Sequence, residues 1–197
     1  MSLEQLLKNL EQLGLDNDDA QSERSKKYLN ITRDTGEFLA VLIKATDAKT
    51  VLEVGTSNGY STLWLTSSLP DGGHVFTIEN NSRKIDEASE NFRKAELDSK
   101  ITQLDGDVVD LLSKLSPNID FIFLDADRSQ YLAIAKQLFG LLKEGGLLVC
   151  DNAVSHKEEL EEFNAWIADQ SNLSTSLVPV GKGELLVYKD RSTRSLS

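Results

Sequence analysis

Residues 50–61 read TVLEVGTSNGYS and contain the end of a buried strand, a glycine turn and the start of a helix. The apolar run Thr50–Val54 predicts the strand, and residues 60–68 have the pattern of a helix. Gly55 and Gly59 allow a tight turn and a close approach of the backbone to a ligand, while the first turn of the helix presents free N–H groups. This arrangement is typical of nucleotide-binding sites, although a simple strand-to-helix turn can have the same sequence.

The alternation of strands and helices continues beyond this unit. Five strand–helix repeats predict a parallel, doubly wound α/β sheet. Two amphipathic helices precede the repeats: residues 2–13, ending at Gly14, and a second helix that starts near Thr32 and ends before Lys49. Two last strands flank residues 181–183 (GKG), which are typical of a tight hairpin. The remaining predicted strands are 74–78, 101–104, 120–124, 146–150, 176–180 and 184–189, and the remaining helices are 82–95, 108–115, 130–142 and 157–169.

The size and composition fit one globular domain. The chain has 197 residues, of which 40% are hydrophobic, and this is enough to bury a substantial core. We expect residues 1–48 to form a cap of helices, 49–190 the α/β core and 191–197 a tail. The sequence has no signal-peptide pattern and no apolar run of membrane-spanning length, and its single cysteine, Cys150, fits a reducing compartment. These features predict a cytoplasmic protein with no membrane contact.

The charge of the chain also limits its partners. The formal net charge is −11, whereas proteins that bind nucleic acid over a broad surface depend on clustered Lys and Arg. We therefore expect a small-molecule substrate and no nucleic-acid partner.

Acidic residues follow the second and third strands of the repeat. Ligands of open α/β sheets lie beyond the carboxyl ends of the strands. Glu79 stands 24 residues after Gly55 (79 − 55), and its carboxylate can accept hydrogen bonds from both hydroxyls of a ribose. Asp107, after Gly106, is placed to reach an adenine edge, and it can also cap the next helix. The turn lacks the Gly-x-Gly-x-x-Gly pattern, and Glu53 stands two residues before its first glycine, which argues against NAD.

Oxygen-bearing side chains follow the fourth and fifth strands. Asp125 comes directly after the fourth strand, and Asp151 and Asn152 come after the fifth. Because adjacent parallel strands bring their carboxyl ends together, these three donors should meet, and two close carboxylates repel unless a cation lies between them. Magnesium suits such a set, and manganese or calcium would also fit. The alternative is that each aspartate caps a helix on its own.

These motifs together resemble the metal-dependent O-methyltransferases, the group that contains catechol and caffeoyl-CoA O-methyltransferases and small bacterial relatives. The likeness covers about residues 28–189. It is carried by residues 51–61 (VLEVGTSNGYS), by residues 121–131 (FIFLDADRSQY) and by the pair Asp151 and Asn152. It implies a Rossmann-like sheet of seven strands, mostly parallel with an antiparallel last strand, and a homodimer.

The resemblance also implies the residues of the site. S-adenosylmethionine would lie over the first two strand ends, with Ile31 and Thr32 near its methionine part and Ser61 at its carboxylate. The metal ligands would be Asp125, Asp151 and Asn152. The full set expected to bind S-adenosylmethionine is Ile31, Thr32, Glu53, Gly55, Ser57, Ser61, Glu79, Asp107, Val108 and Asp125.

Two features depart from the family pattern. The best-known members have a lysine that can act as a base three residues after the first metal aspartate, whereas this chain has Arg128. Arginine stays protonated and cannot accept a proton. The expected catalytic residues are Asp125, Asp127 and Arg128. Arg128 would stabilise an anionic substrate or the oxyanion, and either Asp127 or a water would take the proton. The long insertion that follows the Asp-Asn pair in the plant enzymes is also missing.

The motifs predict a methyl-transfer reaction. A divalent metal would bind an oxygen of a small acceptor with two neighbouring hydroxyls and lower its pKa, and this oxygen would attack the sulfonium methyl. Two alternatives stay open: a metal-independent methyltransferase, and an S-adenosylmethionine-binding protein with little or no catalysis, which the absence of the lysine would favour. Nucleotide-dependent oxidoreduction is disfavoured by the glycine spacing.

Overall fold

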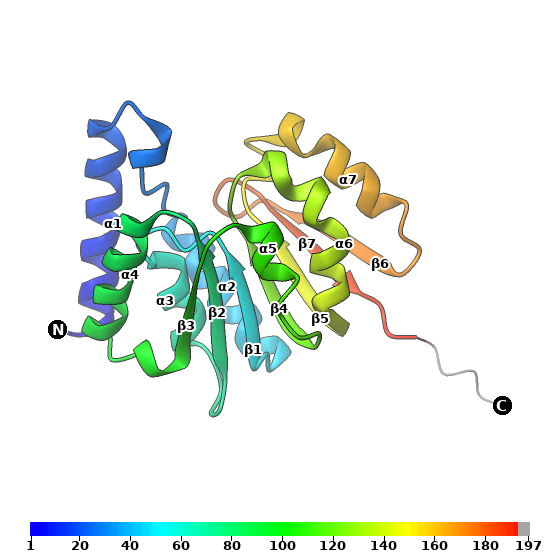
Figure 1. Cartoon of the computed structure of the whole chain (residues 1–197), viewed down its shortest axis with the longest axis horizontal. Helices are drawn as coiled ribbons and strands as arrows, with labels where there is room; N and C mark the ends of the chain where they lie inside the picture. Colours follow the sequence, from blue (N-terminus) through cyan, green and yellow to red (C-terminus); the bar gives the residue numbers. More distant parts are fainter. Residues whose placement is uncertain (193–197) are drawn as a thin grey trace.

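The computed structural model describes residues 1–192 and has a central seven-stranded sheet with helices on both faces (Figure 1). The strand order is β3-β2-β1-β4-β5-β7-β6. Strands β1 to β5 run parallel, and β7 lies antiparallel between β5 and β6. This confirms the predicted doubly wound sheet with an antiparallel last strand. The strands are β1 Thr50–Val54, β2 His74–Glu79, β3 Ile101–Asp105, β4 Ile119–Leu124, β5 Leu142–Cys150, β6 Leu173–Val178 and β7 Glu184–Lys189.

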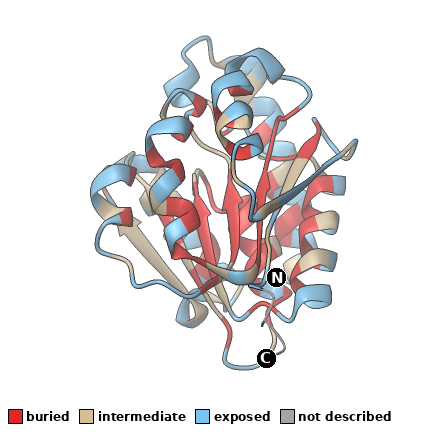
Figure 2. Cartoon of the chain, turned by 90° about the vertical axis from the view of Figure 1, so that its right-hand side faces the viewer, coloured by how far each residue is buried: buried red, intermediate tan, exposed pale blue. Residues whose placement is uncertain are grey.

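Two groups of helices cover the two faces of the sheet. Buried residues of α1 to α4 share one hydrophobic core with one face, and buried residues of α5 to α7 share a second core with the other. The sheet and the inner sides of the helices are buried, whereas the outer sides of the helices are exposed (Figure 2). The helices are α1 Leu3–Ala20, α2 Arg33–Thr46, α3 Tyr60–Ser67, α4 Ser82–Lys94, α5 Val108–Leu112, α6 Tyr131–Leu141 and α7 Glu161–Ala168.

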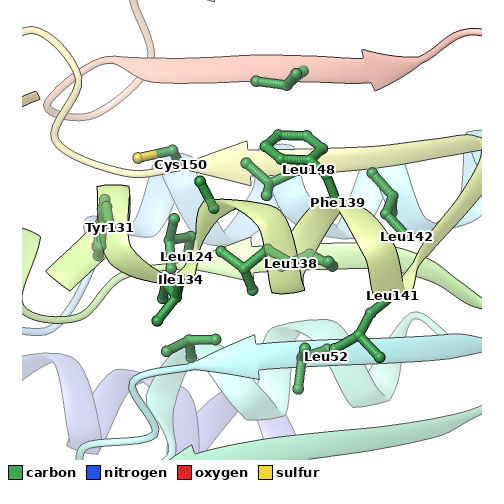
Figure 3. Close-up of a cluster of buried hydrophobic side chains, with 14 of the residues drawn as sticks. Leu52, Leu124, Tyr131, Ile134, Leu138, Phe139, Leu141, Leu142, Leu148 and Cys150 are labelled. Atoms are coloured by element: carbon green, nitrogen blue, oxygen red, sulfur yellow. The ribbon is translucent and has the colours of Figure 1, made fainter. Parts of the chain in front are cut away.

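The two cores follow from the alternation of side chains along each strand. In β4, Phe121 and Phe123 belong to the core under α1 to α4, whereas Ile122 and Leu124 belong to the core under α5 to α7. Figure 3 shows part of this second core, in which side chains of α6 such as Leu138 lie over the strands. The central strands are therefore held on both faces, and this fixes the positions of their carboxyl ends.

The first helix is longer than its sequence pattern predicts. The prediction that it ends at Gly14 was wrong, since α1 continues to Ala20. Gly14 lies inside the helix, and its lack of a side chain leaves room for Asn30. A Cβ atom on Gly14 would be 2.5 Å from Nδ2 of Asn30. Asp18, beyond the predicted end of this helix, accepts a hydrogen bond from the N–H of Tyr28 at 2.8 Å. The extra turns of α1 therefore anchor the segment before α2.

Smaller differences occur near the C-terminus. The predicted helix 157–169 is divided into the 3₁₀ turn Lys157–Leu160 and α7, β5 begins four residues earlier than residue 146 (146 − 142), and β6 begins at Leu173 instead of residue 176. The split into a cap, a core and a tail stays a prediction, and residues 193–197 of the tail lie outside the described residues. Within residues 1–192 no helix is both long and apolar enough to cross a membrane.

Candidate active site

The carboxyl ends of three neighbouring strands bring polar residues into one row. Strands β1 and β4 end in register, as do β4 and β5, so that the next residues, Gly55, Asp125 and Asp151, lie side by side. Gly55 has a φ of +108°, and a Cβ atom on it would be 2.0 Å from the carbonyl oxygen of Asp125. Only glycine permits this approach. The glycine turn and the acidic end of β4 are therefore in direct contact.

The three predicted metal ligands also lie together. Nδ2 of Asn152 is 2.7 Å from Oδ2 of Asp151 and 3.4 Å from Oδ1 of Asp125. Asp151 and Asn152 are almost fully buried. In the part of the chain that the structure describes, no group of three or more His, Cys, Asp or Glu side chains is arranged to hold a metal ion. A cation here would therefore use Asn152 as its third protein donor, after a half-turn of the amide that presents Oδ1 to the two carboxylates.

The electrostatics of this group fit a bound cation. Burial raises the pKa of Asp125, and the charge of Asp151 raises it further, while Lys182 and Arg128 act in the opposite direction. A carboxylate whose ionisation is disfavoured by burial and by a neighbouring negative charge is stabilised when a positive charge lies beside it. A hard divalent cation with oxygen ligands would supply that charge. The donor set therefore fits the ion that the sequence predicts.

Glu184 is a buried carboxylate next to this group that the sequence analysis did not find. Strand β7 pairs with β5 so that Leu185 lies opposite Cys150, and the same register sets Glu184 opposite Asp151. The side chain of Glu184 is fully buried, and its Oε1 accepts a hydrogen bond from Oγ1 of Thr35 at 3.1 Å. Burial, and then the charge of Asp151, raise the pKa of Glu184. In the sequence, this residue could have been noticed as a single acidic residue at the start of a mainly apolar strand.

The predicted ribose-binding residue lies against the glycine turn. Oε2 of Glu79 accepts a hydrogen bond from the N–H of Ser57 at 2.9 Å, and Oε1 accepts one from the N–H of Asn80 at 3.0 Å. The hydroxyl of Ser57 donates to the carbonyl oxygen of Tyr28 at 2.6 Å. The segment before α2 is therefore fastened to the glycine turn. In this segment, Ile31 is buried in the core and Thr32 is the N-cap residue of α2.

Two other predicted cofactor residues, Glu53 and Ser61, are hydrogen-bonded to each other. Glu53 is fully buried and accepts hydrogen bonds from the hydroxyls of Ser61 at 2.6 Å, Thr62 at 2.5 Å and Thr77 at 2.6 Å. In this conformation the hydroxyl of Ser61 is committed to Glu53, and the cofactor roles of both residues stay predictions. Glu53 fixes the start of α3 to β1 and β2. The sequence could not show this, because the three hydroxyls come from two separate elements.

Burial raises the pKa of Glu53 to about 7 even though three hydroxyls donate to it. The folded protein then binds a proton at this site more tightly than the unfolded chain does, so the free energy of unfolding should fall as the pH rises from about 4.5 to about 7, by about 3 kcal/mol. We expect Glu53→Gln to remove this loss, since an amide does not titrate. Urea unfolding at pH 5 and pH 7.5 measures this change in the free energy of unfolding, and Glu90→Gln, at an exposed glutamate, is the control. If the free energy of unfolding falls by the same amount in the Glu53→Gln variant and the wild type, the assignment is wrong.

Asp107, predicted to reach the adenine, and its neighbour Val108 lie at the start of α5. The carboxylate of Asp107 is exposed and accepts a hydrogen bond from the N–H of Val109 at 2.9 Å, so it caps the helix. Val108 is buried. Capping leaves further lone pairs of Asp107 free, and its adenine role stays a prediction.

The structure does not bring Asp127 and Arg128 into the group of oxygen donors. Asp127 is exposed and caps the short 3₁₀ turn Arg128–Gln130, where it accepts hydrogen bonds from Ser129. Arg128 is buried and pairs through Nε with Oε2 of Glu159 at 2.7 Å. It lines a cavity of about 260 Å³ next to α7 together with several glutamates. Arg128 is therefore paired through Nε, while its buried Nη2 atom has no hydrogen-bond partner among the described residues.

Comparisons with known proteins identify the family of the chain. A family model described as O-methyltransferase matches residues 4–190. A catechol O-methyltransferase of Niastella koreensis is 31% identical over 145 residues, which cover 72% of this chain and 66% of that protein. Caffeoyl-CoA O-methyltransferase 1 of Nicotiana tabacum is 30% identical over 179 residues, which cover 79% of this chain and 75% of that protein.

Solved structures share the fold. One is the O-methyltransferase TomG from Streptomyces achromogenes in complex with S-adenosylmethionine. It superposes with a TM-score of 0.82 at 23% identity, and the match covers 94% of this chain and 90% of the TomG chain. An O-methyltransferase from Bacillus cereus, in complex with S-adenosylhomocysteine, has a TM-score of 0.79 at 24% identity and covers 94% and 91%. At this level of identity the two structures establish the fold alone.

Proposed function

Because the chain belongs to the O-methyltransferase family, we propose that it transfers a methyl group from S-adenosylmethionine to a hydroxyl of a small acceptor with two neighbouring hydroxyls, with the help of a divalent cation. One observation carries this proposal: the glycine turn touches the backbone of Asp125, whose side chain lies beside Asp151 and Asn152. A methyl donor over the turn and an acceptor oxygen at the three donors would therefore be neighbours, as direct transfer requires. The names of the catechol and caffeoyl-CoA relatives support a dihydroxylated acceptor.

The residues on the cofactor side would bind and orient the methyl donor. S-adenosylmethionine supplies a methyl group on a positively charged sulfur. Glu79 lies at the end of β2, where its carboxylate can accept hydrogen bonds from ribose hydroxyls. The N–H of Tyr60 donates to Oδ1 of Asn58, and the N–H groups that follow it in the first turn of α3 could bind a carboxylate. The segment fastened by Ser57 to Tyr28 would cover the cofactor and exclude water.

The residues on the acceptor side would hold the ion and the reacting oxygen. Asp125, Asp151 and Asn152 are the protein ligands in this proposal. When bound, the divalent cation would supply positive charge that favours the ionised form of an acceptor hydroxyl. Asp127 faces Ser129 and Arg128 cannot take a proton, so we assign the proton to a water. A homodimer and a cytoplasmic location also stay predictions.

A second candidate is a methyltransferase that works without a metal. It is favoured by the side-chain amide of Asn152, which already donates hydrogen bonds to Asp151 and Asp125. In that case the acceptor would be a group that needs no ion to become nucleophilic.

A methyl-transfer assay decides between the two candidates. The purified protein is incubated with S-adenosylmethionine and a set of catechols, phenolic acids and hydroxylated nucleosides, with and without magnesium. Methylation of a dihydroxylated acceptor only when magnesium is present supports the main proposal. Transfer that continues in the presence of a chelator supports the metal-free candidate, and no transfer to any acceptor would count against both.

The cofactor half of the proposal has its own test. We expect Glu79→Gln to weaken binding of S-adenosylhomocysteine by about 10-fold to 100-fold, because charge-assisted hydrogen bonds to the ribose are worth about 1.5–3 kcal/mol. Calorimetric titration measures this affinity. Asp105→Asn is the matched control, since Asp105 is exposed at the neighbouring strand end and pairs in register with Glu79. Equal affinity of the Glu79→Gln variant and the wild type would remove Glu79 from the cofactor site.

A further inference from the structure

We propose that Lys182 selects acceptors that carry a carboxylate, so that the preferred acceptor of this enzyme is a dihydroxylated aromatic acid. The inference rests on the proposed function, because it takes the acceptor to bind at Asp125, Asp151 and Asn152. Lys182 lies between two glycines in the turn formed by residues 181–183, which joins β6 to β7. Its position over the proposed acceptor site follows from the backbone.

The backbone of this turn is bonded to the residues that follow Asn152. The carbonyl oxygen of Lys182 accepts hydrogen bonds from the N–H groups of Val154 at 3.3 Å and Ser155 at 3.1 Å. The carbonyl oxygen of Gly183 accepts one from the N–H of Ala153 at 2.8 Å. Three successive residues after Asn152 are therefore tied to the turn. This sets the Cα atom of Lys182 beside the end of the proposed metal site.

Both neighbouring glycines are packed tightly. The N–H of Gly181 donates to Oδ2 of Asp34 at 3.1 Å, and a Cβ atom on Gly181 would be 2.1 Å from Oγ1 of Thr35. A Cβ atom on Gly183 would be 2.3 Å from Cγ2 of Val154. The turn is held between the start of α2 and the residues after β5, and it has no room to slide. Lys182 is the one residue of the turn with a side chain.

Lys182 is a cation without a fixed partner. Its residue is exposed, and no acidic group in the described residues 1–192 forms an ion pair with it within 4.0 Å. Arg128, the other cation near Asp125, is paired with Glu159. The backbone of Lys182 is hydrogen-bonded to Val154 and Ser155, two and three residues after Asn152. Its side chain therefore starts next to the proposed acceptor site.

A divalent cation at the site would change the balance of charge around Lys182. The ion would offset the two negative charges of Asp125 and Asp151. The ammonium group of Lys182 would then be available to pair with another anion, and an acceptor bound by its hydroxyls can supply one at its far end. One ammonium group matches one carboxylate, whereas a phosphate is more commonly bound by several donors or by the fork of an arginine.

Binding of a matched pair of acceptors tests this inference. The probes are 3,4-dihydroxybenzoate and its neutral amide, titrated by calorimetry into the protein loaded with magnesium and S-adenosylhomocysteine. We expect Lys182→Gln to weaken binding of the acid about tenfold and binding of the amide less than twofold, since one charge-assisted hydrogen bond is lost. Lys182→Arg should keep most of the preference for the acid. Lys114→Gln, at an exposed lysine beyond α5, is the control and should change neither affinity.

The same proteins are then assayed for methyl transfer to both acceptors. A Lys182→Gln variant that loses affinity for both probes equally, or for neither, would overturn the role of Lys182, as would a wild type that binds neither probe. Equal kcat/KM values of the wild type for the amide and the acid would also overturn the role of Lys182, but they would leave the proposed function intact. A wild type that binds the acid through Lys182 but methylates neither probe would support the charge preference and count against methylation of dihydroxylated rings.

Discussion

Asp151→Ala should lower magnesium-dependent methyl transfer about 1,000-fold, because a catalytic cation supplies several kcal/mol of charge stabilisation and each 1.4 kcal/mol changes the rate tenfold. Asp151 lies between Asp125 and Glu184 in the row of strand ends and is hydrogen-bonded to Asn152. Without its carboxylate the site keeps one charged ligand and one amide. Binding of S-adenosylmethionine should change less than threefold, because none of the cofactor contacts proposed here comes from the end of β5.

Initial rates measure the loss of methyl transfer, and calorimetric titrations measure the binding of S-adenosylmethionine. Adding a chelator to the wild type should have the same effect as the substitution, and excess magnesium should restore the wild type but not the variant. Asp71→Ala, in an exposed turn before β2, is the control for a lost carboxylate. An Asp151→Ala variant that loses cofactor binding in parallel with turnover would mean that the substitution damages the whole site. One that keeps the wild-type rate would favour the metal-free candidate.

The sequence predicted the parts of the site that follow parallel strands. Asp125, Asp151 and Asn152 come together because β4 and β5 are adjacent and parallel, and a chain that alternates strands and helices has few other ways to arrange its strand ends. The same reasoning found Glu79 beside the glycine turn. These predictions needed only the order of elements and the first residue after each strand.

The parts that were missed depend on the last two strands and on side-chain direction. β7 inserts between β5 and β6, and this order sets Glu184 opposite Asp151 and Lys182 over the residues after Asn152. A hairpin pattern in the sequence does not say which of its strands pairs with β5. Likewise, Asp127 is two residues from Asp125 in the sequence, but it caps a 3₁₀ turn and so points to Ser129. Chain proximity alone did not predict its partner.

Gly55→Ala should destabilise the protein by about 4 kcal/mol and lower its melting temperature by about 10 °C. Two costs add up in this estimate. The φ of +108° at Gly55 strains any residue with a Cβ atom, at about 1–3 kcal/mol. The new Cβ atom would also lie 2.0 Å from the carbonyl oxygen and 2.8 Å from the carbonyl carbon of Asp125, and relief of such a contact by backbone shifts costs about 1–3 kcal/mol more.

The second cost is the informative one, because the atoms that must move belong to Asp125. Gly72→Ala is the matched control: Gly72 also has a positive φ, of +76°, but a Cβ atom there would have no other atom within 4 Å. Thermal and urea unfolding of both variants therefore separate backbone strain from the contact with Asp125. If Gly55→Ala costs no more than Gly72→Ala, the glycine turn does not touch the end of β4 as described. In that case the cofactor and the acceptor need not be neighbours, and the observation that carries the proposed function is lost.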